Sequence, residues 1–197
     1  ADTLRLYIMF LGDFEKAAPW SQASIKGCRR FLERVWALSD WVTDESEEYS
    51  SELESVMHKT IKKVDEDVGR MKFNTAIAAM MSLMNEFAAK KRLTRGEYKT
   101  FLLLLNPFAP HMTEELWERA RFPGLCSIAP WPKFDEAKTQ DEMVELVLQV
   151  NGKVRDKITL PAGTPQDEAR QAAMDNKRVR ELIDGRQVVK AIVVPNK

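Results

Sequence analysis

The segment Asn106–Trp117 decides the predicted fold; it reads Asn-Pro-Phe-Ala-Pro-His-Met-Thr-Glu-Glu-Leu-Trp. The residues before it, Phe101–Leu105, are apolar on every side, which is typical of a buried helix. Pro107 lacks an N–H and disfavours helical geometry at the preceding residue, so this helix should end there. Pro110 suits the first turn of a new helix, because an N–H is not needed at that position. Two buried helices that meet at a stiff corner predict further helices packed around them.

Composition restricts the class of protein. The 197 residues contain 30 basic and 30 acidic side chains, so net charge does not indicate a polyanionic partner. Cys28 and Cys126 are isolated, which argues against a thiol redox motif or a cysteine-based zinc site. Free thiols without a signal peptide predict a cytoplasmic protein, and no apolar run is long enough for a membrane span. Because the sequence starts at Ala1, we expect it to be a fragment of a longer protein.

Apolar residues at helical spacing predict several more helices before the corner. Asp2 is expected to cap a first helix that ends at Gly12, and a second helix runs from Ser21 to about Val42. Ser51 and Glu54 fit a capping box at the start of a third helix. A fourth helix carries a methionine-rich stripe, which favours core packing, with a promiscuous binding groove as the alternative; it spans 73–91.

The sequence changes character after the corner. Residues 122–141 contain prolines and glycines without periodicity, which predicts a linker, with Trp131 anchored on the bundle. Residues 144–150 then alternate between apolar and other side chains, as a strand does, and Asn151-Gly152 marks a hairpin turn.

The register of this hairpin depends on the length of its loop. A two-residue loop would pair Leu148 with Arg155 and would mix apolar and basic side chains on one face. A three-residue loop with a left-handed Gly152 pairs Leu148 with Val154, and we predict this register. Asp156 then remains an outlier on the apolar face. Lys153, Arg155 and Lys157 would all project from the solvent face of one strand.

Two helices and a strand complete the predicted tail. Thr164 is expected to cap one helix, a second short helix follows Asn176, and residues 187–194 form a strand. The fold class is therefore mainly α: an antiparallel helical bundle followed by a small α+β domain of order β-β-α-α-β. We expect that truncation removed a final strand. The predicted regions are 1–12, 13–121 for the bundle, 122–141 for the linker and 142–197 for the α+β domain.

The corner segment resembles the last-helix signature of the anticodon-binding bundle in class I aminoacyl-tRNA synthetases of the Leu/Ile/Val/Met group. Residues 149–155, Gln-Val-Asn-Gly-Lys-Val-Arg, resemble the C-terminal domain of the bacterial leucyl enzymes. Residues 1–6 resemble the segment after the Lys-Met-Ser-Lys-Ser loop, so 1–12 would end the stem-contact region. That loop and the His-Ile-Gly-His signature are absent from this sequence.

The residues themselves offer no catalytic or metal site. His111 with Glu114 and Glu115 superficially resembles a metalloprotease helix, but the second metal-binding histidine is missing. No glycine-rich phosphate loop follows a strand. The resemblance implies that ATP, with magnesium, is used by the parent enzyme and not by this fragment, with catalytic and editing domains in cis.

Because no catalytic site is predicted, the expected function is tRNA binding. The resemblance implies that leucine tRNAs are bound, through contacts to their phosphate backbone and by their overall shape. The predicted tRNA-binding residues are Arg30 and Arg34 in the bundle, and Lys153, Arg155, Lys157, Arg186 and Lys190 in the tail. Arg29, Lys62 and Lys63 are weaker candidates. The alternative is a helical protein–protein scaffold that does not bind RNA, because a charged sheet face is common.

Overall fold

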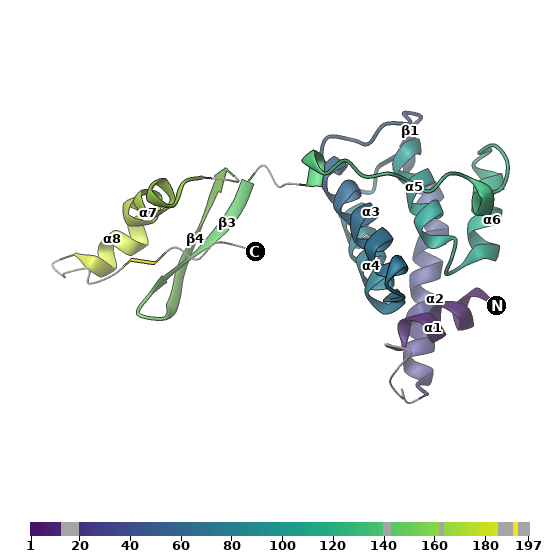
Figure 1. Ribbon diagram of the computed structural model, residues 1–197, viewed down its shortest axis with the longest axis horizontal. Helices are drawn as coiled ribbons and strands as arrows, with labels where there is room; N and C mark the ends of the chain where they lie inside the picture. The colour runs from purple at the N-terminus through teal and green to yellow at the C-terminus, as the bar shows by residue number, and fades with distance from the viewer. Residues whose placement is uncertain (13–19, 140–142, 162–163, 185–190, 193–197) are drawn as a thin grey trace. The chain divides into compact units, whose positions relative to one another are not determined.

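The structure is a computed structural model that describes residues 1–12, 20–139, 143–161, 164–184 and 191–192 (Figure 1). Contacts divide the chain into two compact units, residues 1–139 and 140–197. The first unit contains the helices α1 (Asp2–Phe10), α2 (Gln22–Trp36), α3 (Glu54–Gly69), α4 (Phe73–Lys90), α5 (Arg95–Leu105) and α6 (Pro110–Arg119). The second contains β3 (Met143–Val150), β4 (Lys153–Pro161), α7 (Gln166–Asp175) and α8 (Lys177–Ile183). The predicted class, mainly α with a small α+β part, is confirmed.

The predicted corner is confirmed. Helix α5 ends at Leu105, two residues before Pro107, and α6 begins with Pro110 in its first turn. All five side chains of Phe101–Leu105 are buried. The Asn106 amide donates to the Thr113 hydroxyl at 2.9 Å, so a buried hydrogen bond closes the corner where the helical ladder stops.

The core of the first unit lies between α3, α4 and α5. Helices α3 and α4 pack along one another, and the side chains between them are fully buried. These side chains are Met57, Ile61 and Val64 from α3 and Ile77, Met80 and Met84 from α4. Phe87 and Phe101 meet edge to face, with ring centroids 5.5 Å apart. The methionine-rich stripe therefore belongs to the core, and the alternative of a binding groove is wrong.

The capping box of the first unit is at a different place from the predicted one. The N-cap of α3 is Leu53, without a side-chain cap, so the box predicted at Ser51 and Glu54 is wrong. The observed box lies at the start of α5, between Thr94 and Glu97. The fully buried Glu97 carboxylate also accepts from the Ser50 backbone N–H at 2.8 Å and from its hydroxyl at 2.6 Å.

The chain approaches itself closely beside this box. Strands β1 (Val42–Asp44) and β2 (Leu93–Thr94) pair in parallel, and the Gly96 N–H donates to the Ser46 carbonyl at 2.9 Å. A Cβ atom at Gly96 would lie 2.1 Å from the Glu47 carbonyl oxygen. Only glycine fits there, because any side chain would force the two backbones apart.

Residues 122–139, assigned above to a linker, pack on the helical unit. The Glu114 carboxylate accepts from the backbone N–H groups of Cys126 and Ser127, both at 2.8 Å. Cys126 is 3% exposed, whereas Trp131 is 36% exposed. The predicted anchor at Trp131 is therefore wrong. The segment is held by its backbone amides, by Cys126 and by Phe134, which packs against the core.

The hairpin has a different register from the predicted one. Val150 pairs with Lys153 across a two-residue turn, in which Asn151 and Gly152 have φ of 53° and 74°. A two-residue hairpin turn of this kind needs positive φ at both positions. Asn and Gly adopt positive φ at little cost, so the Asn-Gly pair favours this turn. A bulge then leaves Arg155 without a partner, so that Leu148 pairs with Asp156. Beyond the bulge, Leu146 lies opposite Ile158, whereas Val150 still lies opposite Lys153 near the turn.

This register also changes where the basic side chains point. Lys153 lies opposite Val150 and Lys157 lies opposite Val147. Because successive side chains of a strand alternate, Lys153 and Lys157 project from opposite faces of the hairpin. All three basic residues of β4 are exposed, but the single face predicted for them is wrong.

Asp156 has a structural role in the second unit. Its carboxylate accepts from the Asn176 side-chain amide at 3.0 Å and lies 3.9 Å from Arg178, both at the start of α8. Asn176 also caps α8, the short helix that was predicted to follow this residue. Thr164 does not cap α7; its hydroxyl donates to the Pro161 carbonyl at 2.5 Å instead. Most of the predicted strand 187–194 lies outside the described residues, and Ala191 and Ile192 are not in a strand.

Candidate nucleic-acid interface

A group of four cationic side chains lies on the exposed face of α2. The opposite face of this helix is buried, through Cys28, Phe31, Leu32 and Val35. Ser21 fixes the start of the helix, because its hydroxyl accepts from the Ser24 N–H at 3.3 Å. The helical period therefore turns the following residues toward solvent: Lys26, Arg29, Arg30 and Arg34. We call these four residues the α2 basic face.

Most of the charge on the α2 basic face is not neutralised. Arg29 pairs with Glu33 at 2.8 Å. Arg34 donates to the side-chain oxygen of Asn85 at 2.9 Å, which is a neutral partner. Within the described ranges, Lys26 and Arg30 have no ion-pair partner. Free guanidinium and ammonium groups on one helix face are suited to binding phosphates along a strand.

Several other basic residues of the first unit are already paired. The acidic segment 44–52 binds cations at the end of α4 and after it: Lys90 with Glu52 at 2.5 Å, Arg92 with Asp44 at 3.7 Å, and Arg95 and Lys99 with Glu47 at 3.1 and 3.0 Å. Lys62 pairs with Glu136 and Lys63 with Asp67. The α2 basic face is thus a better anion-binding surface than these paired cations.

The second unit offers fewer unpaired cations than the sequence suggests. Lys157 pairs with Glu145 at 2.7 Å. Lys153 and Arg155 are exposed, and no ion pair involves them in the described part of the chain. Arg186 and Lys190 lie outside the described residues. Two of the five predicted tail residues are therefore exposed cations without a carboxylate partner.

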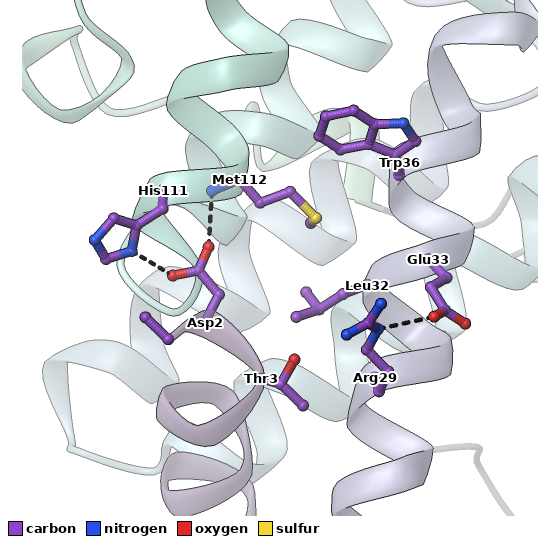
Figure 2. A pocket seen from close by; sticks show the side chains of 9 residues that line it. Asp2, Thr3, Arg29, Leu32, Glu33, Trp36, His111 and Met112 are labelled. Atoms are coloured by element: carbon purple, nitrogen blue, oxygen red, sulfur yellow. Dashed lines mark hydrogen bonds and ion pairs between the residues drawn. The ribbon is translucent and has the colours of Figure 1, made fainter.

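A hollow that the sequence does not reveal lies beside the α2 basic face. Its wall is formed by residues of α1, α2 and α6, which Figure 2 shows around an open space: Asp2, Thr3, Arg29, Leu32, Glu33, Trp36, His111 and Met112. Trp36, which helical spacing places on the inner stripe of α2, is 40% exposed. The Arg119 guanidinium lies 4.7 Å from the centroid of its ring. No local signal predicts this hollow, because more than 70 residues separate Trp36 from His111.

Among the described residues, no cluster of side chains is suited to a metal ion. They contain no group of three or more histidine, cysteine, aspartate or glutamate side chains that could hold a metal ion. Burial raises the pKa of Cys126 to about 12, so this thiol stays protonated at neutral pH. In the same part of the chain, every helix is too short or too polar to cross a membrane.

Comparison with known proteins places most of the chain in a family. The family model described as the anticodon-binding domain of tRNA ligase matches residues 50–171, which is more than half of the chain. The chain therefore belongs to the family of anticodon-binding domains of tRNA ligases.

Particular relatives narrow this assignment. The chain is 50% identical, over its full 197 residues, to a leucine–tRNA ligase of Alkaliphilus oremlandii (strain OhILAs). It is 40% identical over 198 aligned residues to a leucine–tRNA ligase of Borreliella afzelii (strain PKo). In both cases it spans 24% of the length of the relative.

A solved structure is also similar. It is the crystal structure of the ternary complex of Agrobacterium radiobacter K84 agnB2 LeuRS with tRNA and LeuAMS. The match has a TM-score of 0.78 and 28% sequence identity, and covers 98% of this chain and 28% of the other. Both the sequence and the fold thus resemble the leucine–tRNA ligases over almost the whole chain.

Proposed function

We propose that this chain is the tRNA-holding part of a leucine–tRNA ligase. The parent enzyme would join leucine to tRNA with ATP and magnesium, using catalytic and editing domains in cis. The chain itself would bind leucine tRNAs and orient them without taking part in the chemistry. Its free cysteines suit a cytoplasmic setting.

The observation that carries the proposal is the α2 basic face, in a chain that belongs to this family. Arg30 and Lys26 are unpaired in the described structure, and Arg34 is held by a neutral amide. Such groups bind phosphates without reading bases, which suits recognition of helical RNA by its backbone and shape. Lys153 and Arg155 would form a second contact, whereas Lys157, which projects from the opposite face of the hairpin and pairs with Glu145, would reach RNA separately. We include Arg186 and Lys190 in that second contact on the sequence alone.

The test is a salt titration of the 197-residue chain with an unmodified leucine tRNA transcript. The logarithm of the association constant should fall linearly with the logarithm of salt concentration. Replacing both Arg30 and Arg34 by alanine should weaken binding and make the slope shallower by about 1 to 2, since each lost phosphate contact removes roughly one unit.

The matched control is Arg92→Ala, which removes an exposed arginine that pairs with Asp44. It should leave both the affinity and the slope close to those of the unaltered chain. Absence of tRNA binding, or binding that does not change with salt, would support a protein–protein scaffold and overturn the proposal. Equal losses in the control and in the double variant would remove the α2 basic face from it.

A further inference from the structure

Two neighbouring depressions on the first unit share one residue. The hollow of Figure 2 has Arg29 in its wall, and a second depression is lined by Ala23, Lys26, Arg29 and Arg30. Arg29 thus connects a region with apolar walls to a region lined by cations. A nucleotide has the same division, because its base is flat with apolar faces and its phosphate is anionic.

We propose that the hollow holds one unpaired base of a bound tRNA, while the second depression binds the phosphate next to that base. This inference rests on the tRNA binding proposed above and adds a single-nucleotide subsite to it. Bases in a helix are stacked on their neighbours and cannot enter a hollow, so the base must come from a loop, a bulge or an end.

The walls of the hollow suit a base. Leu32, Met112 and Trp36 supply apolar surface, and the 40% exposure of Trp36 leaves part of its indole open to a ligand. Proteins often hold unpaired nucleotides by stacking their bases on aromatic side chains. The Arg119 guanidinium, 4.7 Å from the ring centroid and paired with Glu115, holds the indole in place before a ligand binds.

The rim of the hollow carries polar side chains, and both of its carboxylates already have hydrogen-bond or ion-pair partners. The His111 side chain is 75% exposed and the Thr3 hydroxyl lines the hollow, so both can hydrogen-bond the edge of a base. The two carboxylates are occupied: Glu33 pairs with Arg29, and Asp2 accepts from His111 and Met112. Repulsion of an incoming phosphate is thereby reduced.

The spacing along α2 fits one nucleotide. Trp36 follows Arg30 by six residues, which is about 9 Å along the helix axis at the usual rise per residue. An extended arginine side chain and a nucleotide can bridge this separation together. The charges also suit a phosphate on the N-terminal side of the hollow. Lys26 and Arg30 lie on the turns of α2 before the hollow and are unpaired among the described residues.

The experiment compares three variants of the 197-residue chain in binding a leucine tRNA transcript at fixed salt. Trp36→Leu should weaken binding roughly tenfold, which is the usual size of one base–aromatic stack. Trp36→Tyr keeps an aromatic face and should retain most of the affinity. Trp20→Leu is the matched control, because Trp20 is 63% exposed and lines neither depression, and it should bind like the unaltered chain.

Two further measurements separate stacking from damage to the fold and from the proposed function. The salt slope of Trp36→Leu should be unchanged, because no phosphate contact is lost, and its thermal unfolding should match that of Trp36→Tyr. In ¹H–¹⁵N spectra, the indole N–H signal that disappears in Trp36→Leu should be the one that shifts on adding tRNA.

The outcomes distinguish the two proposals. Full affinity in Trp36→Leu, or an equal loss in Trp20→Leu, would overturn the subsite while leaving tRNA binding intact. A Trp36 indole signal that does not move with saturating tRNA would overturn it as well. If the chain does not bind tRNA at all, both the proposed function and the subsite are wrong.

Discussion

The carboxylate of Asp2 caps helix α6 from 110 residues away: its Oδ2 accepts from the Met112 backbone N–H at 2.7 Å. Its other oxygen lies 2.7 Å from Nδ1 of His111, in the first turn of the same helix. Asp2 does not cap its own helix, whose N-cap is Ala1, so the predicted role of this residue is wrong. A carboxylate at a helix N-terminus satisfies a free N–H group and interacts favourably with the helix dipole.

We predict that Asp2→Ala lowers the free energy of unfolding of the first unit by about 1–2 kcal/mol, the usual loss for a helix cap. All five tryptophans, at positions 20, 36, 41, 117 and 131, lie in this unit, so tryptophan fluorescence during urea unfolding measures its stability. Asp2→Asn keeps one acceptor oxygen and should lose less.

The control for this prediction is Asp65→Ala, which removes an exposed aspartate from α3 and should change stability by less than about 0.5 kcal/mol. Unchanged urea midpoints for both Asp2 variants would show that the cap contributes nothing to the stability of the bundle.

A second prediction concerns the pH dependence that His58 produces. The His58 side chain is 8% exposed, and its Nδ1 accepts from the Asp135 backbone N–H at 3.1 Å. Burial lowers the pKa of His58 below its usual 6.5, and the charge of Lys138 lowers it further, against the opposite effect of Glu54 and Asp135. The neutral imidazole is therefore favoured in the folded state.

The lowered pKa of His58 determines how the stability of the fold changes with pH. Stability that depends on neutral His58 is fully present above about pH 6.5 and is lost as the pH falls toward the lowered pKa of the folded state. Urea unfolding followed between pH 7.5 and about pH 5 should show this loss. His58→Gln should reduce it, whereas His111→Gln, at the other histidine, should keep it. A loss of equal size in His58→Gln would assign the effect to other groups.

A third prediction concerns the contact between the hairpin and α8. The Asp156 carboxylate accepts from the Asn176 amide and from the Lys157 N–H, the latter at 2.9 Å, and it also interacts with Arg178. These contacts lower the pKa of Asp156, and the hydrogen bond from Asn176 has the largest effect. Asp156→Ala should release the start of α8 and accelerate hydrogen exchange of the amides of 177–183. The contribution of the ionised carboxylate should be present above pH 3.8 and lost as the pH falls below it.

Hydrogen exchange resolved by residue measures this effect separately in each unit. Glu181→Ala is the control, because Glu181 is an exposed acidic residue of the same helix. It should leave exchange of α8 nearly unchanged, and neither variant should alter the first unit. Equal protection of α8 in Asp156→Ala and in the unaltered chain would contradict the role assigned to Asp156.

The sequence alone determined the features that depend on local covalent geometry. Pro107 ends α5 and Pro110 starts α6. Proline has no N–H and a fixed φ, so it affects only the residues next to it in the chain, and the sequence is enough to place both effects. The methionine-rich stripe of α4 likewise predicted a helix that packs in the core, because methionine side chains fill irregular gaps between helices. The resemblance of the corner and hairpin segments to the leucyl enzymes also came from sequence.

Only the tertiary structure decided which polar groups meet. Asp2 binds α6, Ser50 binds Glu97 and Asp156 binds Asn176, and each pair joins elements whose distance no local pattern encodes. The hairpin register shows the limit most clearly: matching of side chains favoured a three-residue loop, whereas the structure has a two-residue Asn-Gly turn followed by a bulge at Arg155. The hollow at Trp36 exists only because three separate helices converge, and convergence is a property of packing.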